Sequence, residues 1–567
     1  MRTDIDAGAL VERGKTLHRQ GRQDEAEALY RQALEVDSEN ADALHMLGVI
    51  ANQRGEYKQA ASLIGKAIQR KPGAEHFHSN LGLALMGSGE LDAACIAFLA
   101  ELERFPASHA SHVNLGALLH KLRRYEQAIE HYRTALSMLP DDFEVLNNLG
   151  VAHLELRQFE SAEEVARKSL GLRGANPEAL NLLGLVSRQQ GRPEDALGYF
   201  IEALKLKPMG AEILFNAGVA CREMGDYERA LAYYDQALAL KPDYPDPHYS
   251  RGRALLALGR FEEGWREHEY GLLCGERSPR PRPYPVWTGG ALENRALLLS
   301  AEQGLGDEIM FASVLPDVIE RASQCIVECD ARLLPIYRRS FPSVILIPRS
   351  FVAEPDPAEQ IERIDLQLPL GSLPLHYRRS AADFPRHNGY LKADPAKVAD
   401  WKNRLDALGP GLKIGISWRG GTPKTGSDRR SLPLEEWMPL LGRQGIQFVS
   451  LQYTECSEEI AALARRHGVN VTHWQQAIED YEETAALVSA LDFVITIQTA
   501  IFHLSGALGR PVWGMISDPP EWRYQQKGES LPWYPSARLF RQRTPGDWQQ
   551  VLKDVSASLD DLVRPGA

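Results

Sequence analysis

The sequence is poor in cysteine and has no long apolar run, and both absences exclude classes of protein. Its six Cys residues are spread over 567 positions, which is too few and too scattered for a disulfide framework. No run of about 18 apolar residues occurs, so no segment is expected to span a membrane. The first residues contain no apolar stretch of the length that a signal peptide needs. The cytoplasm is therefore the expected location.

Positive charge is also in deficit. Lys and Arg number 64 against 76 Asp and Glu, which gives a net charge of −12. Such a surface does not as a whole attract phosphate backbones or anionic membranes, so no nucleic-acid partner is expected. Cys325 and Cys329 form the closest Cys pair, but they lie in an apolar run typical of a buried strand, with no second Cys or His pair nearby. We therefore expect no metal site at this pair.

Length and composition indicate several ordinary folded domains. At roughly 150 residues per domain, the chain is long enough for three or four units. With 44% hydrophobic and 25% charged residues, it is neither collagen-like nor disordered.

A 34-residue period runs through the first half of the chain. Small residues recur at this spacing in two series, one of Gly14, Gly48, Gly82, Gly116, Gly150, Gly184, Gly218 and Gly252, the other of Ala26, Ala60, Ala94, Ala128, Ala162, Ala196, Ala230 and Gly264. Small side chains at these positions let the two helices of a repeat approach closely. The pattern resembles the tetratricopeptide repeat over about residues 8–278. It predicts eight helix pairs over 1–278, stacked into a superhelix with a concave groove.

An asparagine ladder is expected in this groove. Two residues before the repeat glycine, on the first helix of four units, lie Asn80, Asn114, Asn148 and Asn216. A side-chain amide both donates and accepts hydrogen bonds, so a column of amides can hold an extended peptide backbone. The long nucleocytoplasmic protein O-GlcNAc transferases carry a similar ladder. The alternative is that these Asn are ordinary solvated groove residues.

The second half of the chain has a different pattern. Residues 279–291 are rich in proline and predict a linker. After them, buried apolar strands alternate with helices, which indicates parallel α/β sheets. The length suits two Rossmann-like subdomains, 292–393 and 394–567. The expected strands are 296–300, 325–329, 344–347, 364–368, 413–417, 447–451, 493–497, 512–515 and 538–541.

Two strand-to-helix turns carry candidate site residues. The strand 296–300 leads to Gly304, Gly306 and Asp307, which open a helix at the edge where open α/β sheets place ligands. Asp307 could instead simply cap that helix. The strand 493–497 leads to a second turn, whose residues are Gln498, Thr499, Ala500 and, one turn later, His503. Thr499 and the first amides of this helix form a potential anion site, unless His503 is only structural.

A long basic loop and a group of rings complete the candidates. The loop follows strand 413–417, spans 418–431 and begins with Trp418. Its cations Arg419, Lys424, Arg429 and Arg430 could neutralise a diphosphate, unless the loop is only solvated. Further on, Arg523 lies among Trp522, Trp533 and Tyr534. These rings could stack on a base, or could form the rim of the core.

The joint order of these motifs resembles one family. Glu-Gln-Gly-x-Gly-Asp, Gly-x-x-Trp, Arg-Ser-Leu-Pro-Leu, Ser-Leu-Gln, Thr-Ala-x-x-His-Leu-x-Gly-Ala-Leu-Gly, Trp-Tyr-Pro and Leu-Phe-Arg-Gln follow one another over about 286–560. This order is similar to the C-terminal region of bacterial tetratricopeptide-repeat glycosyltransferases, relatives of the lipopolysaccharide heptosyltransferases. The resemblance implies a GT-B fold with the acceptor facing the first subdomain, the nucleotide sugar held by the second, and no obligatory metal.

The resemblance also implies roles for single residues. Asp307 corresponds to the candidate general base, while Gly304, Gly306, Gln452, Thr499, Ala500, His503, Arg523 and the loop 418–431 correspond to the donor side. Many relatives have Asp where this chain has Gln498, which can bind a ribose hydroxyl but carries no charge.

The expected function is a protein O-glycosyltransferase that moves a sugar onto Ser or Thr of a polypeptide recruited by the repeats, with flagellin as a specific case. Two alternatives stay open. One is a non-catalytic adaptor with a degenerate nucleotide-sugar fold, and the other is a glycosyltransferase acting on a non-protein glycan.

Overall fold

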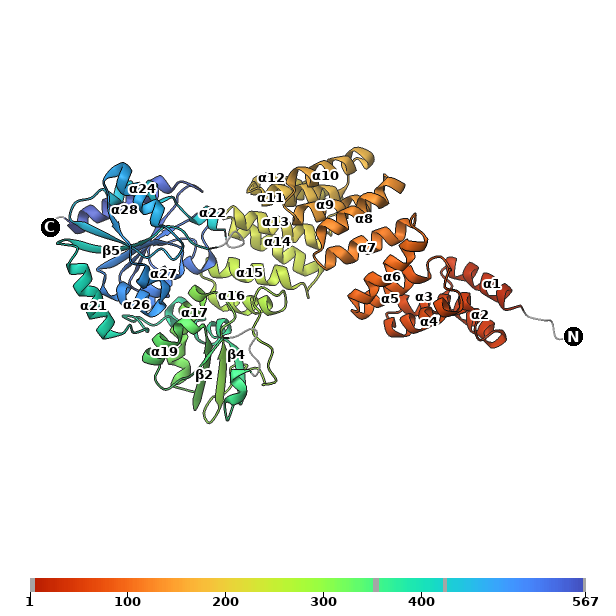
Figure 1. Ribbon diagram of the computed structural model, residues 1–567, viewed down its shortest axis with the longest axis horizontal. Coiled ribbons are helices and arrows are strands. Elements are labelled where there is room, and N and C mark those ends of the chain that lie inside the picture. The colour runs from red at the N-terminus through yellow and green to blue at the C-terminus, as the bar shows by residue number, and fades with distance from the viewer. Residues whose placement is uncertain (1–5, 350–355, 422–425, 564–567) are drawn as a thin grey trace. The chain divides into compact units, whose positions relative to one another are not determined.

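The computed structural model describes residues 6–349, 356–421 and 426–563, and Figure 1 shows their helices and strands. Lys424 lies outside the described residues. The chain forms two compact units, Met1–Ile213 and Leu214–Ala567. Unit 1 contains the first repeats. Unit 2 contains the last repeats together with the α/β part, so the candidate site residues after Leu214 belong to one unit.

The first unit is a succession of antiparallel helix pairs. Its elements are α1 (Ala7–Arg19), α2 (Gln23–Val36), α3 (Ala41–Gln53), α4 (Tyr57–Arg70), α5 (Phe77–Ser88), α6 (Leu91–Arg104), α7 (His109–Lys121), α8 (Tyr125–Met138), α9 (Phe143–Glu155), α10 (Phe159–Arg173), α11 (Pro177–Gln189) and α12 (Pro193–Leu206). Each helix packs against the next one along the chain.

The repeat glycines lie where the two helices of a pair touch. A Cβ atom on Gly82 would come within 2.7 Å of the Phe98 ring, and one on Gly116 within 2.6 Å of Tyr132. Both rings are buried on the second helix of their pair. Any side chain at the glycine would therefore displace a core ring. This close approach is the physical reason for the 34-residue period.

The second unit opens with the last repeat helices. These are α13 (Ala211–Glu223), which begins just before the unit, α14 (Tyr227–Leu240), α15 (Pro245–Ala257) and α16 (Phe261–His268). The predicted architecture of tandem repeat helices followed by parallel α/β sheets is confirmed by α1–α16 and the two sheets that follow.

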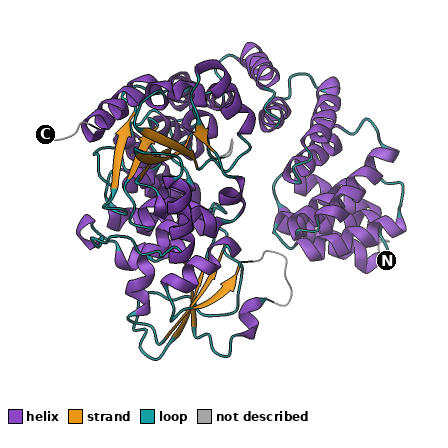
Figure 2. Cartoon of the chain, turned by 60° about the vertical axis from the view of Figure 1, so that its left-hand side comes forward, coloured by secondary structure: helices purple, strands orange, loops and turns teal. Residues whose placement is uncertain are grey.

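The α/β part contains two separate parallel sheets, visible as two groups of strands in Figure 2. The first has the order β3-β2-β1-β4 and the second β10-β9-β8-β5-β6-β7. Their strands are β1 (Ala296–Ser300), β2 (Gln324–Cys329), β3 (Ile345–Pro348), β4 (Leu366–Pro369), β5 (Leu412–Ser417), β6 (Ile446–Ser450), β7 (Val471–Thr472), β8 (Phe493–Ile497), β9 (Val512–Ile516) and β10 (Ala537–Arg541).

Helices of the α/β part follow the strands in sequence. The regular helices are α17 (Leu305–Phe311), α18 (Leu315–Ile319), α19 (Leu334–Ser340), α20 (Pro374–Tyr377), α21 (Pro395–Asp406), α22 (Ser427–Arg430), α23 (Met438–Leu441), α24 (Ser457–His467), α25 (Gln475–Glu479), α26 (Tyr481–Ala490), α27 (Ala500–Ala507) and α28 (Trp548–Val563). After β1 the chain forms α17, a 3-10 turn and α18 in direct succession, because Pro316 starts a new helix.

The proline-rich segment 279–291 lies along the first sheet. The amide of Trp287 donates to the carbonyl of Gln367 in β4, at 2.9 Å, and the amide of Gln367 donates to Pro285 at the same distance. The side chain of Arg282 is buried and pairs with Glu328 and Asp356. The segment predicted as a linker thus adds a short partner to the edge of the sheet.

An aromatic cluster joins the last repeat to both sheets. Trp265 of α16 is 1% exposed, and its indole N–H donates to the carbonyl of Arg378 at 2.8 Å. Its ring meets those of Phe311, Trp522 and Trp533 at centroid distances of 6.4, 5.5 and 6.1 Å. Trp522 and Trp533 are both buried in this cluster, and Trp522 also lines the pocket described below.

Candidate active site at the sheet edges

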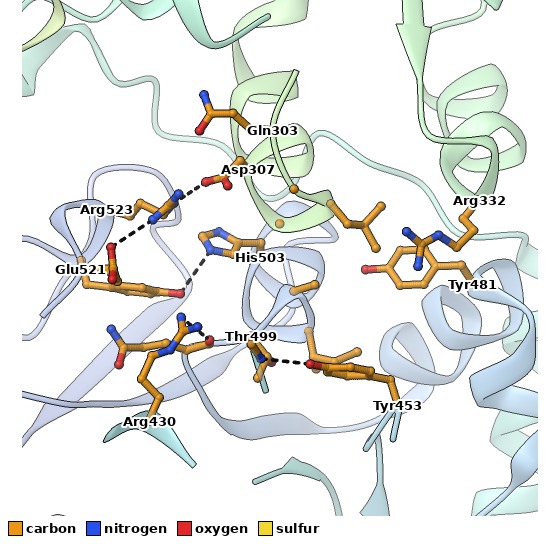
Figure 3. A pocket seen from close by; sticks show the side chains of 18 of the residues that line it. Gln303, Asp307, Arg332, Arg430, Tyr453, Tyr481, Thr499, His503, Glu521 and Arg523 are labelled. Carbon is orange, nitrogen blue, oxygen red and sulfur yellow. Dashed lines mark hydrogen bonds and ion pairs between the residues drawn. The ribbon is translucent and has the colours of Figure 1, made fainter. Parts of the chain in front are cut away.

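A pocket of about 780 Å³ lies in unit 2, at the carboxyl ends of β1 and β8 (Figure 3). It is lined by the turn after β1, the turn after β8, the segment Glu521–Tyr524 and helix α15. The carboxyl ends of parallel strands are where open α/β sheets bind ligands. The lining includes nine of the predicted site residues, namely Gly304, Gly306, Asp307, Arg430, Gln498, Thr499, Ala500, His503 and Arg523.

The two turns meet because one of them is glycine-rich. Helices α17 and α27 pack against each other at their starts. A Cβ atom on Gly306 would lie 3.0 Å from His503 and 3.6 Å from the Cα of Ala500. Glycine at position 306 thus permits a close approach between a helix of the first sheet and a helix of the second.

Asp307 faces this pocket and is ion-paired. The Nε of Arg523 donates to Oδ1 of Asp307, and their side chains are 18% and 15% exposed (Figure 3). The guanidinium of Arg523 also lies over the Trp522 ring, 4.8 Å from its centroid. The candidate base and a candidate donor-binding cation, 216 positions apart in sequence, are direct partners.

Glu521 is a second acidic partner of Arg523. Its Oε2 lies 3.5 Å from Nη1 of Arg523 and 3.1 Å from Nη2 of Arg253, a residue of the repeat helix α15. Burial alone would raise the pKa of Glu521. Nearby arginines outweigh that effect and lower the pKa to about 2, so the carboxylate is charged at neutral pH.

The start of α27 forms the cationic side of the pocket. Thr499 is the N-cap residue in extended conformation, and its hydroxyl contacts that of Thr496 at 3.1 Å. Arg430 donates to the carbonyl of Gln498 at 3.3 Å, which brings its guanidinium beside the helix start. A helix N-terminus carries a partial positive charge, so this end of the pocket suits an anion.

His503 is held as a neutral ring. Its Nδ1 lies 3.0 Å from the Tyr534 hydroxyl and its Nε2 3.2 Å from the Tyr524 hydroxyl. Burial, helped by Arg523 and Arg430, lowers its pKa to about 3. The side chain therefore supplies no positive charge near neutral pH, and both ring nitrogens are already hydrogen-bonded.

Gln498 and Gln452 use their amides inside the protein. Oε1 of Gln498 accepts from the backbone amide and the hydroxyl of Ser517, at 3.2 and 2.8 Å. Its buried Nε2 has no partner among the described residues. Gln452 is fully buried, accepts from the amides of Trp418 and Arg419, and donates to the carbonyl of Arg419. It anchors the start of the basic loop and lies outside the pocket lining.

The basic loop divides between two places. The Trp418 ring is fully buried and donates to Glu459 at 3.0 Å. Arg419 pairs with Glu459 at 3.0 Å and lines a neighbouring hollow of about 400 Å³. Among the loop's predicted cations that the structure describes, Arg430 is the one that lines the main pocket.

Some lining residues carry no sequence signal. Tyr249 and Arg253 come from a repeat helix, where the 34-residue pattern predicts only packing or groove positions. Tyr481 begins α26 and points its hydroxyl into the pocket, opposite Asp307 (Figure 3). That hydroxyl has no hydrogen-bond partner among the described residues, and burial raises its pKa. Isolated tyrosines and arginines belong to no motif, so only the fold brings them together.

Three ladder asparagines lie on neighbouring first helices of unit 1. Helix α7 contacts both α5 and α9, and α5, α7 and α9 carry Asn80, Asn114 and Asn148 in that order. Asn80 already contacts Nε2 of His45 at 2.8 Å, while Asn114 and Asn148 are half-buried. Asn216 is buried on α13 in unit 2.

Comparison with known families confirms the repeats. Two models described as "Tetratricopeptide repeat" match the chain, one at residues 11–75, 53–110, 181–245 and 222–264, the other at 107–175. The N-terminal region is therefore built of tetratricopeptide repeats. Within the described ranges, no helix combines the length and apolar character needed to cross a membrane.

Among curated proteins, Protein FlbA of Caulobacter vibrioides is 35% identical over 318 residues, covering 53% of this chain and 52% of that protein. The chain thus spans about half the length of this relative. Among solved structures, a tetratricopeptide repeat protein from Parabacteroides merdae matches with a TM-score of 0.39 at 19% identity, covering 42% of this chain and 93% of that one. Pseudomonas aeruginosa PilF matches with a TM-score of 0.32 at 23% identity, covering 37% and 96%.

Proposed function

We propose that this protein is a glycosyltransferase that moves a sugar from a nucleotide-sugar donor to Ser or Thr hydroxyls of a polypeptide, with flagellin as a specific acceptor. The proposal rests on one observation above all. A carboxylate from the first sheet, Asp307, and the cationic start of α27 face the same 780 Å³ pocket. The repeats would recruit the polypeptide, and the transfer would take place in the cytoplasm.

The groups in the pocket match the needs of glycosyl transfer. The acceptor hydroxyl must lose a proton, which a carboxylate such as Asp307 can take. The leaving diphosphate must be stabilised, which the helix start and Arg430 can do without a metal. Arg523 connects these two tasks, because it pairs with Asp307 and is itself a phosphate-binding type of side chain.

The test is donor turnover by the purified protein. We expect release of nucleoside diphosphate from at least one nucleotide sugar, with kcat lowered by about 10²- to 10⁴-fold in Asp307→Asn. The matched control is Asp400→Asn, an exposed carboxylate on α21, which should keep wild-type turnover. Thermal unfolding shows whether Asp307→Asn still folds. Equal turnover by wild-type and Asp307→Asn protein would refute the role of Asp307.

A non-catalytic adaptor is the second candidate, and Gln498 favours it. The Oε1 of its amide is held by Ser517, and the position lacks the charge that many relatives have there. An adaptor would bind its protein partner through the repeats and show no turnover with any nucleotide sugar. That pair of results would replace the transferase proposal.

A further inference from the structure

The segment that carries Arg523 into the pocket is held by the repeat helices. The Tyr227 hydroxyl donates to the carbonyl of Pro520 at 3.0 Å. The backbone amide of Gln526 donates to the carbonyl of Ala257 at 2.8 Å, and its side chain donates to Gly225 at 2.9 Å. Residues on both sides of Arg523 are therefore tied to α13, α14 and α15, or to the turns that follow them.

Charged side chains continue this connection to the first sheet. Arg253 of α15 pairs with Glu521, Glu521 lies beside Arg523, and Arg523 pairs with Asp307. The four charges alternate in sign, so each is attracted to the next. All four residues line the pocket. Their side chains are between 15% and 27% exposed, so solvent screens these attractions less than it would at the open surface.

We propose that Arg253 of the last repeat is a positioning residue for the transfer reaction, because through Glu521 it fixes the guanidinium of Arg523 and so the direction of the Asp307 carboxylate. This inference rests on the proposed function for its effect on turnover. Its structural part, the placement of Arg523, does not depend on turnover.

The geometry explains why Arg253 has this effect. Glu521 is within reach of two guanidinium groups, at 3.1 Å from Arg253 and 3.5 Å from Arg523. While Arg253 neutralises Glu521, Arg523 stays with Asp307. Without Arg253, the Glu521 carboxylate attracts the Arg523 guanidinium more strongly and draws it away from Asp307. The last repeat is then part of the reaction site as well as part of the recruiting surface.

The experiment compares three variants at position 253 and on the same helix. Arg253→Ala removes the charge, and Arg253→Lys keeps a cation that can still pair with Glu521. Arg251→Ala is the control, because Arg251 also lies on α15 and pairs with Asp235 and Glu267 but does not line the pocket. Glu521→Gln is the opposite test, since it keeps the shape but removes the carboxylate that competes with Asp307 for Arg523.

We expect Arg253→Ala to lower kcat by about 10- to 100-fold, the size of loss that misplacing a catalytic group produces. Adding Glu521→Gln to Arg253→Ala should recover most of the lost kcat, because no second carboxylate then competes for Arg523. The donor KM should change by less than about 3-fold, because the variants leave the helix start and Arg430 intact. Arg253→Lys should recover most of the kcat, and Arg251→Ala should match the wild type. An equal loss in Arg251→Ala would identify a general packing effect and overturn the proposal.

A crystal structure of Arg253→Ala gives the second readout. We expect Arg523 to turn towards Glu521 and to leave Asp307, and an unchanged Asp307–Arg523 pair would overturn the positioning role. This arm decides the question even if the wild-type protein has no turnover. In that case the proposed function fails, while the placement of Arg523 by Arg253 is still confirmed or refuted by the coordinates.

Discussion

Replacement of Trp265 by Ala tests how the last repeat is joined to the α/β part. The side chain is 1% exposed on α16 and donates to the Arg378 carbonyl. A buried Trp removes roughly 200 Å² from water, which corresponds to about 5 kcal/mol at about 25 cal/mol per Å². Measured truncations of buried rings cost about 3 to 5 kcal/mol, so we expect a loss in that range for unit 2.

The assay must report on each unit separately, because a chain with two compact units does not unfold in one step. Amide hydrogen exchange, read by mass spectrometry under partly denaturing conditions, meets this need. In Trp265→Ala, exchange should accelerate in α16, in α17 and around Trp522, whose ring contacts Trp265. Exchange in α1 to α4 should stay unchanged, because these helices belong to unit 1.

Trp265→Phe is the matched control. It keeps a buried ring but removes the hydrogen bond to Arg378 and part of the buried area, so we expect a smaller loss of about 1 to 3 kcal/mol. A loss below about 1 kcal/mol in Trp265→Ala would refute the reasoning. Faster exchange in α1 to α4 would also refute it, since the ring would then stabilise more than its own unit.

Two further predictions concern the groove and the pH dependence of stability. Asn114→Ala combined with Asn148→Ala should raise the KM for a polypeptide acceptor by about 10-fold, as expected for two lost hydrogen bonds of about 0.7 kcal/mol each, and leave donor hydrolysis unchanged; an unchanged acceptor KM would point to the non-protein glycan alternative. Burial lowers the pKa of His503 from 6.5 to about 3, so the unfolded chain binds this proton between those values and the folded one does not. Stability should therefore fall by about 1.4 kcal/mol per pH unit on acidification from pH 6.5 towards pH 3. Urea unfolding of His503→Asn should lack this one-proton slope, and an identical slope in both proteins would contradict the buried neutral state.

The sequence predicted the repeats and the strands because both follow from local spacing. Gly82 and Gly116 recur at a fixed interval because each lies against one buried ring. Strands such as β8 read as apolar runs because parallel sheets are covered on both faces. The expected strands agree with β1–β6 and β8–β10 within about two residues. Strand β7 has only two residues, too few to give a periodic signal.

Site residues were predictable only where a sequence motif coincides with a strand-to-helix turn. Gly304, Gly306, Asp307, Thr499 and Ala500 follow strands, so their place at the sheet edge follows from chain order. Contacts between residues far apart in the sequence leave no local pattern from which they could be predicted. The Asp307–Arg523 pair and the Trp265 cluster depend on how the last repeat packs on both sheets. Gln452 shows the opposite case, where a residue from a recognised motif serves the backbone of a loop.

Because Tyr249 and Arg253 of a repeat helix line the pocket, not every repeat can be exchanged freely in evolution or in engineering. Repeats within Met1–Ile213 contribute no residue to the pocket lining, so they can be added, removed or exchanged while the lining stays the same. The helices α13 to α16 belong to the same compact unit as the pocket and have to be kept together with it. A chimaera with a different set of repeats must therefore be joined upstream of α13, even though the periodicity continues well beyond that point.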